Sequence, residues 1–344
     1  MREIIEKFPP DFAHWHCEEK KILNRHLAFK NLKILADGSV VLNSGKDYFR
    51  IGHGDKVEND SEYSLGQLET LVPNVEIYKI FRSITVTEVN SDGKVYMCGN
   101  DLADNRPTLV CFENGEKLWQ VYMVGAAYDI NLTKSYIVCE FRQPKKTEIN
   151  LYDIANGGYL FSRDSNLVLR EAAFSSKRDF VAIDVVDEIK AIDLVIENEP
   201  VQGATIDKVF MGPDGDLAAC LRRRGAKTTI CLTDLETATK REANFNGIGN
   251  FYGNGVSIGQ VDVRPLDKDR VLLSGKTRNG FSLKVFDFEK DRFVWSNHYT
   301  GKLEAIDIAD RQISFSYHIL NQNNDPIEHI FETWKPDRFG GKND

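Results

Sequence analysis

Short runs of alternating apolar and polar residues recur along the whole chain, and turn signals separate them. The runs 84–89 and 95–98 flank a turn at 90–93 that ends in Asp-Gly, and 209–211 and 217–221 flank a second such turn at 212–215. Asp-Gly between two alternating runs is a strong signal for a β-hairpin. The pattern therefore predicts an all-β chain built from antiparallel hairpins.

An acidic residue recurs at the end of strand-like segments. It occupies six positions, spaced by 40, 40, 41, 53 and 45 residues: Glu113, Asp153, Asp193, Asp234, Asp287 and Glu332. This spacing is the length of a four-stranded propeller blade. We expect the Asp at the end of a third strand to accept hydrogen bonds from the backbone N–H groups of the turn that follows it.

A further unit precedes these six. Hairpin signals at 32–35, 40–42 and 48–51 predict three strands, and Ile77–Phe81 is expected to supply a fourth after a long polar insertion. The last unit has too few residues for its fourth strand, so a segment near Phe12–Cys17 is expected to complete it and close the ring. The predicted fold is a single seven-bladed β-propeller with four-stranded antiparallel blades. We place these blades at about 26–82, 84–124, 125–165, 167–202, 203–245, 256–299 and 301–334 of one domain, with a polar tail at 335–344.

The blade repeat resembles that of WD-repeat propellers over roughly residues 26–334. The dipeptides 152–153, 233–234 and 286–287 stand where that family has Trp-Asp, and Gly125, Gly203 and Gly301 stand where it has Gly-His. No Trp precedes these acids and no His follows these glycines. The resemblance therefore implies the architecture and not that family's His–Asp network.

Composition fits a soluble globular protein, with 42% hydrophobic and 28% charged residues. The net charge of −8 argues against general nucleic-acid binding. No apolar run approaches the ~18 residues that span a bilayer, and the chain begins without the apolar stretch of a secretory signal. We therefore expect a cytoplasmic monomer without membrane contact.

The six cysteines form no close Cys-x-x-Cys pair, so we expect buried thiols and neither a metal nor a cofactor. Cys98 and Cys111 are expected to face each other across a hairpin, as are Cys220 and Cys231.

Charge separates the two predicted faces of the ring. The loops between second and third strands at 142–146, 222–227 and 276–279 hold nine basic and no acidic residues, whereas the loops between third and fourth strands are acidic. The connection 244–255 adds exposed aromatic candidates to the basic face. The candidate partner-binding residues are Arg142, Lys145, Lys146, Arg222, Arg223, Arg224, Lys227, Phe251, Tyr252, Lys276 and Arg278.

This polarity predicts a non-catalytic scaffold or inhibitor module that docks an acidic protein. The alternative explanation is that these loops are charged only because they are solvated. A second hypothesis is an enzyme, or a binder of a cation or small ligand, that uses carboxylates of the innermost strands at the central channel. Those candidates are Asp129, Glu171, Asp207, Asp262 and Asp307. No nucleophile motif or Gly-rich phosphate loop supports catalysis. A weaker alternative is contact with RNA or anionic lipid through the basic loops.

Overall fold

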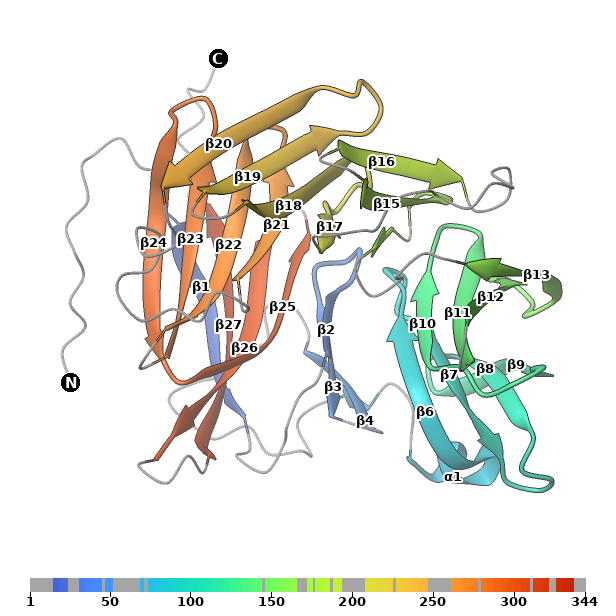
Figure 1. Ribbon diagram of the computed structural model, residues 1–344. Helices are drawn as coiled ribbons and strands as arrows, with labels where there is room; N and C mark the ends of the chain where they lie inside the picture. The colour runs from blue at the N-terminus through green and yellow to red at the C-terminus, as the bar shows by residue number, and fades with distance from the viewer. Residues whose placement is uncertain are drawn as a thin grey trace, which may run out of the picture.

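The computed structural model describes residues 15–23, 31–44, 47–51, 69–70, 74–143, 146–165, 172–175, 177–185, 188–193, 208–224, 227–246, 261–277, 280–309, 312–321 and 326–336. These residues form seven antiparallel sheets, which confirms the predicted seven-bladed propeller (Figure 1). Along the chain we number the sheets as blades 1 to 7.

Each of the first three blades has four strands in chain order. Blade 1 contains β2 (Asn31–Ile34), β3 (Val40–Ser44), β4 (Asp47–Ile51) and β5 (Glu69–Thr70). Blade 2 contains β6 (Phe81–Val89), β7 (Val95–Asp101), β8 (Pro107–Glu113) and β9 (Glu116–Tyr122). Blade 3 contains β10 (Asp129–Leu132), β11 (Tyr136–Gln143), β12 (Lys146–Asp153) and β13 (Tyr159–Ser165).

Among the described residues, blade 4 has three strands and the remaining blades have four. Blade 4 contains β14 (Ala173–Phe174), β15 (Phe180–Val185) and β16 (Glu188–Asp193). Blade 5 contains β17 (Val209–Met211), β18 (Leu217–Arg224), β19 (Lys227–Asp234) and β20 (Lys240–Asn246). Blade 6 contains β21 (Val261–Asp267), β22 (Arg270–Thr277), β23 (Gly280–Asp287) and β24 (Arg292–Thr300). Blade 7 contains β25 (Lys302–Ala309), β26 (Gln312–Leu320), β27 (Pro326–Pro336) and β1 (Trp15–Leu23).

The first strand of each blade is its innermost strand. First strands of neighbouring blades contact one another: β2 contacts β25, β6 contacts β10, and β17 contacts both β14 and β21. In Figure 1 these strands turn toward the middle of the molecule, whereas β9, β13, β20 and β24 lie at its periphery. Seven apolar clusters fill the spaces between successive blades, one at each interface. The core is therefore a ring of interfaces, and every blade depends on two neighbours.

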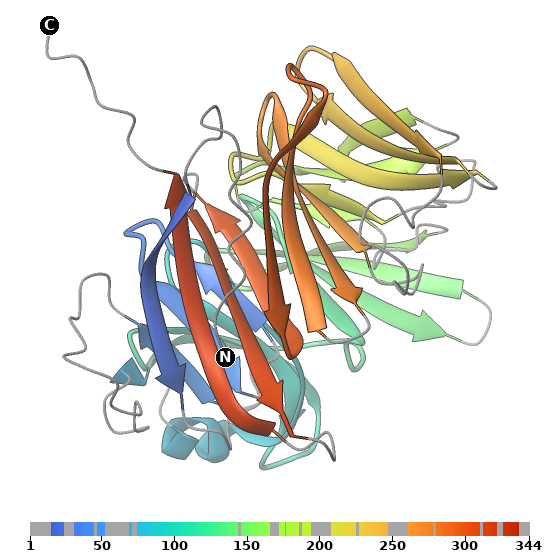
Figure 2. The ribbon, with the colours of Figure 1, turned by 90° about the vertical axis from the view of Figure 1, so that its left-hand side faces the viewer.

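The N-terminal strand closes this ring, as the sequence predicted. β1 pairs antiparallel with β27 from Trp15 opposite Pro336 to Leu23 opposite His329. Figure 2 shows the blue β1 beside the red β27. The strand continues beyond the predicted 12–17, and positions 12–14 lie outside the described residues.

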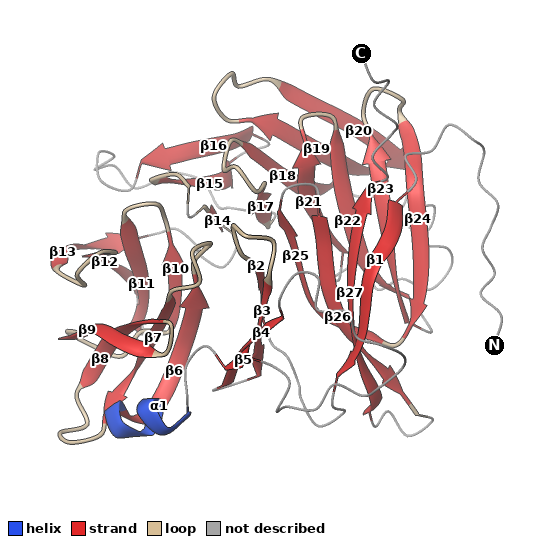
Figure 3. Ribbon diagram, turned by 180° about the vertical axis from the view of Figure 1, so that it is seen from behind, coloured by secondary structure: helices blue, strands red, loops and turns tan. Residues whose placement is uncertain are grey.

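The expected fourth strand of blade 1 at Ile77–Phe81 is wrong. Residues Asn74–Ile80 form α1, the one helix of the described residues (Figure 3), and β5 pairs with β4 instead. Ile77 is buried and Ile80 packs against the same cluster, while Tyr78 and Lys79 are exposed. A three-residue spacing of apolar contacts is helical, whereas a strand would alternate. In the described part of the chain no helix is long and apolar enough to cross a membrane.

The expected role of the repeated acid is confirmed in three blades. The Oδ1 atom of Asp153 accepts hydrogen bonds from the N–H groups of Ala155 (2.8 Å) and Asn156 (3.1 Å). Asp234 and Asp287 cap their turns in the same way, with bonds of 2.8 to 3.0 Å. These bonds hold each outer hairpin closed.

One of the two predicted cysteine pairs is correct. Cys220 lies opposite Cys231 in β18 and β19. Cys98 does not face Cys111, because the β7–β8 connection closes at Asp101 and sets a register that places Cys98 opposite Leu109. The Cys98 thiol instead lies 4.0 Å from the Met123 sulfur, and it contacts Cys139 of blade 3.

Candidate functional site

One face of the ring gathers the connections between second and third strands and those between successive blades. Antiparallel pairing brings the hairpin ends together at Gln143 and Lys146, at Arg224 and Lys227, and at Thr277 and Gly280. Because every blade runs from its inner to its outer strand, these ends share one face, which the connection 123–128 also crosses. We call this the hairpin face.

Arg222 does not belong to the exposed part of the hairpin face, which corrects its predicted role. Its side chain is only 4% exposed and forms an ion pair with Asp184 of blade 4, with 2.6 Å between Nη2 and Oδ1. Its Nε atom also donates to both Asp184 oxygens. Successive side chains of a strand point to opposite faces of its sheet, and the side chain of Arg222 points to the face of blade 5 that packs against blade 4. Arg222 therefore joins blades 4 and 5 and cannot steer a partner.

The other predicted residues divide into those that the structure places and those that it does not. Lys276 is exposed near the end of β22. Lys145, Phe251, Tyr252 and Arg278 lie outside the described residues, as do the side chains of Arg142, Lys146, Arg223, Arg224 and Lys227. The basic face thus remains a prediction at these positions.

The structure exposes apolar residues on the hairpin face that the sequence analysis missed. Leu102 lies in the loop between β7 and β8, Tyr122 ends β9, and Val124 and Tyr128 lie in the connection to β10. Together with Arg106, which contacts the Tyr122 ring, we call these residues the Tyr122 patch. Val124 is 81% exposed, Tyr128 57%, Leu102 51% and Tyr122 49%. Large exposed apolar groups in one place are typical of interaction sites.

Backbone hydrogen bonds fix the Tyr122 patch. The Met123 N–H donates to the Pro107 carbonyl (2.8 Å), and the Tyr128 N–H donates to the Glu140 carbonyl (2.7 Å). The Asp101 carboxylate accepts from the N–H of Ala103 (2.8 Å) and from the amide of Gln120 (2.9 Å), which ties the 102–106 loop to β9. The patch is therefore held in place while its side chains face solvent.

Arg106 adds a positive charge to the patch. Its guanidinium carbon lies 3.6 Å from the centre of the Tyr122 ring, a cation–π contact, and its Nε atom forms an ion pair with Asp104.

The sequence feature that could have revealed the Tyr122 patch is the connection Met123–Tyr128. It carries no charged or strongly polar residue although it joins two blades across the surface.

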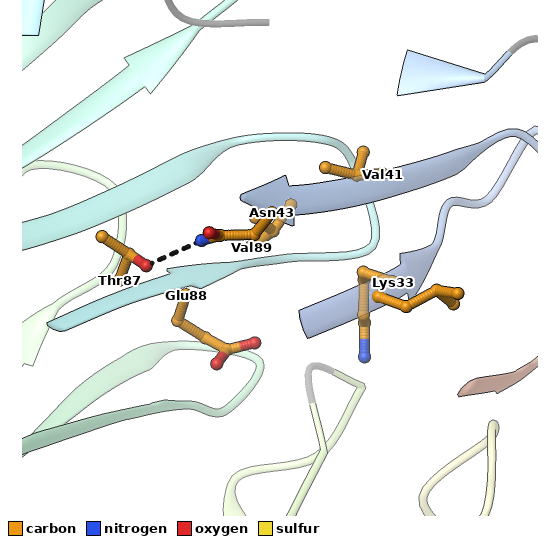
Figure 4. A pocket seen from close by; sticks show the side chains of 7 residues that line it. Lys33, Val41, Asn43, Thr87, Glu88 and Val89 are labelled. Carbon is orange, nitrogen blue, oxygen red and sulfur yellow. Dashed lines mark hydrogen bonds between the residues drawn. The ribbon is translucent and has the colours of Figure 1, made fainter. Parts of the chain in front are cut away.

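The channel end of blades 1 and 2 carries the second candidate site. Burial raises the pKa of the Glu88 carboxyl to about 7; the charges of Asp129 and Asp307 add to this effect, while Lys33 opposes it. Figure 4 shows the Glu88 carboxylate and the Lys33 amine pointing to the same side of the strands. Charged groups from three other innermost strands, β2, β10 and β25, thus influence the Glu88 carboxyl of β6.

The predicted channel carboxylates make different contacts in the structure. Asp307 accepts a hydrogen bond from the Ile34 N–H (2.8 Å), which joins blade 7 to blade 1. Asp262 lies 3.8 Å from the Arg264 guanidinium of its own strand, and Asp129 accepts from the Ile130 N–H (2.9 Å). Glu171 and Asp207 lie outside the described residues.

A small cavity lies between blades 1 and 2 beside this group. Its volume is about 20 Å³, enough for a single water molecule. Asn43 lines it and donates a hydrogen bond to Thr87 (3.0 Å; Figure 4). Within the described residues, no three His, Cys, Asp or Glu side chains are grouped so as to hold a metal ion.

Comparison with known proteins gives no family assignment. No family model matches the chain. A curated relative, "Uncharacterized protein MJ0995" of Methanocaldococcus jannaschii, is 26% identical over 164 residues, which is 45% of this chain and 66% of that protein. The match thus spans less than two thirds of the relative's length. A solved structure, "KlHsv2 with loop 6CD replaced by a Gly-Ser linker", covers 89% of this chain and 96% of its own, with a TM-score of 0.47 and 12% identity.

Proposed function

We propose that this propeller is a non-catalytic protein-binding module whose partner docks on the hairpin face. The observation that carries the proposal is the Tyr122 patch, where a rigid connection presents large apolar side chains to solvent. Tyrosine and arginine are enriched among the residues that dominate binding energy, and here Tyr122 and Arg106 are already in contact. Backbone hydrogen bonds hold the connection at Met123 and Tyr128, so binding there should cost little ordering entropy.

The partner's docking surface is acidic in this proposal. The 142–146 loop, which follows the strand that Tyr128 contacts, holds three basic residues in sequence, and Lys276 is exposed on the same face. Opposite charge steers a partner to the correct face and speeds association. Because salt screens this steering, the complex should form more slowly and bind more weakly at higher ionic strength.

The proposal is tested by crosslinking and affinity purification from the source cells, with quantitative mass spectrometry. The triple variant Lys145→Glu, Lys146→Glu, Lys276→Glu should lose the specifically enriched partner. The matched control is Lys134→Glu with Lys177→Glu and Lys268→Glu; these exposed lysines lie near the turns of the opposite face. Partner recovery that is equal for both triple variants would refute docking on the hairpin face.

We propose binding of a small organic cation in the channel as the second candidate function. The observation in its favour is the excess of carboxylates around Glu88, where Asp129 and Asp307 outnumber Lys33. Calorimetric titration with 1,4-diaminobutane would test it: binding should disappear in Asp129→Asn with Glu88→Gln. Absence of heat with the wild-type protein would exclude this class of ligand.

A further inference from the structure

We propose that the Tyr122 patch binds a short peptide segment in which an apolar side chain lies next to a carboxylate. This inference rests on the protein-binding function proposed above and specifies the chemistry of the partner. The patch offers two kinds of contact on the hairpin face, an apolar surface at Val124 and Tyr128 and a guanidinium at Arg106, which lies against the Tyr122 ring.

The apolar contact is provided by an unusual concentration of exposed groups. Four of the nine large apolar side chains that are exposed in the described residues belong to this patch. Val124 is the most exposed of them, and Ala126, between it and Tyr128, is exposed as well. The centre of the connection is therefore free of charge, and a partner's aliphatic or aromatic side chain would bury apolar surface there.

The carboxylate contact follows from the way Arg106 is held. The Tyr122 ring packs against its guanidinium and Asp104 binds its Nε atom, while 57% of the Arg106 side chain remains exposed. A guanidinium has five N–H donors, so one contact at Nε leaves further donors on its outer edge. A carboxylate can accept two of these in parallel, and the fixed orientation lowers the entropic cost of binding.

The surrounding charges favour an acid over a base in the partner. Asp104, the exposed acid of this loop, is already paired with Arg106. Lys79 and Arg82 are exposed where blade 2 begins, next to the backbone bond that joins Leu102 to Ile80. A basic segment would meet these cations, whereas an acidic one would be attracted by them.

The same charges argue against a second copy of this chain as the occupant. A symmetric dimer through this patch would place Arg106, Lys79 and Arg82 of both chains in one interface, because a two-fold interface pairs a surface with itself. Like charges at a desolvated interface are costly.

The test begins with a displayed library of short random peptides, panned on the full-length protein after depletion on the Val124→Glu variant. Enriched sequences should share a Leu, Ile, Phe or Trp within two positions of Asp or Glu. Synthetic labelled copies are then titrated with the protein, and binding is followed by fluorescence anisotropy. Val124→Glu should abolish binding, and Arg106→Gln should weaken it about tenfold, as expected for loss of a charge-assisted contact.

The matched control is Leu160→Glu, which adds the same charge at an exposed apolar residue near the opposite face, where the outer strand β13 of blade 3 begins. It should leave the affinity unchanged, and urea unfolding should show that all three variants are folded. Replacement of the peptide's acid by its amide should cost affinity in the wild type but not in Arg106→Gln.

Four results would overturn the inference: no enriched peptide, enriched peptides without an acid, equal binding to Val124→Glu, or a concentration-dependent dimer that this substitution abolishes. These outcomes are distinct from failure of the proposed function. If the partner is lost from the lysine variants but retained by Val124→Glu, the hairpin face still binds a protein and only the peptide site is wrong.

Discussion

Glu88 makes the free energy of unfolding depend on pH, and no repeat in the sequence predicts this dependence. Its pKa is raised by burial, and by Asp129 and Asp307, to about 7, whereas an unperturbed Glu titrates near 4.5. Between these two values the folded protein holds a proton that the unfolded chain releases. The free energy of unfolding therefore falls as the pH rises through this window, and protonation of Glu88 restores it.

Glu88→Gln should remove this dependence, because the amide resembles the protonated carboxyl. At about pH 8 the variant should be more stable than the wild type by at most about 3 kcal/mol, and at about pH 5 the two should differ by less than about 1 kcal/mol. Urea unfolding followed by tryptophan fluorescence at both pH values measures the effect. Glu289→Gln, at an exposed turn position, is the control and should change neither value. A variant less stable than the wild type at about pH 8 would show that the attraction of Lys33 outweighs burial.

The ion pair between Arg222 and Asp184 shows why the sequence misassigned a basic residue. The two residues are 38 positions apart and meet only because blades 4 and 5 pack face to face. Three consecutive arginines suggested a solvated loop, yet alternation along β18 turns the first of them into the interface. The pattern of charges along the chain shows that side chains alternate between the two faces of a strand. It does not show the angle at which two neighbouring blades pack.

Removing Asp184 should destabilise the protein strongly, because it takes away the buried carboxylate of Arg222 and leaves the exposed Glu242, at 3.3 Å, as the ion-pair partner that remains. Asp184→Ala is expected to lower the free energy of unfolding by about 3–5 kcal/mol in urea. The control is the exposed pair between the same two blades, in which the Lys177 amine lies 2.7 Å from Asp214. Lys177→Ala should cost less than about 1 kcal/mol. Equal effects of the two substitutions would mean that the buried pair contributes no more than an exposed one.

The acid that recurs along the chain does not have the same role in every blade. Asp153, Asp234 and Asp287 cap their turns as expected. Glu113 does not, because the two-residue turn after it closes through positive φ angles at Asn114 (49°) and Gly115 (82°), and the carboxylate pairs with Lys94 (3.3 Å) instead. Glu332 lies within β27, where it accepts hydrogen bonds from Tyr317 and Trp334. The recurring spacing of 40 to 53 residues therefore located the blades, but it did not give each acid the same role.

The candidate site was less predictable than the strands. Blade length, turn residues and alternation are local, so they predicted the propeller and its closure. Exposure depends on which neighbours cover a segment. The connection Met123–Tyr128 has the composition of a core segment, and only the structure shows that Val124 lies on the surface.

The buried cysteines should be unreactive in the folded protein. Cys98, Cys111, Cys139, Cys220 and Cys231 are free and fully buried. Burial raises the pKa of the Cys111 thiol to about 11, which further suppresses its thiolate. In a Cys17→Ser variant, an aromatic disulfide reagent should label no thiol under native conditions and all five in denaturant. Rapid labelling of one or more thiols without denaturant would show local opening at a blade interface.

At the scale of the whole molecule, a propeller has no free sheet at either end, because each blade is covered by two others. Blade 7 combines three strands from the C-terminal part of the chain with β1, so its sheet forms only when residues separated by nearly the whole chain meet. Closure of the ring therefore depends on a pairing of very high sequence separation, which carries a large loop-closure entropy. An edge that stayed open at β27 would offer unpaired N–H and C=O groups to other chains.

Deletion of residues 1–23 should consequently do more than remove one strand. It exposes the edge of β27 and leaves the interface between blades 7 and 1 weakly closed, so we expect the single cooperative unfolding transition to broaden or split, with aggregation at lower denaturant concentration. Calorimetry together with tryptophan fluorescence would detect the change, because the two probes should then give different midpoints. Deletion of the polar tail 337–344 is the control and should leave both midpoints where they are in the full chain. A deletion variant lacking β1 that keeps one sharp transition at the wild-type midpoint would show that the contacts between β25 and β2 alone hold the ring together.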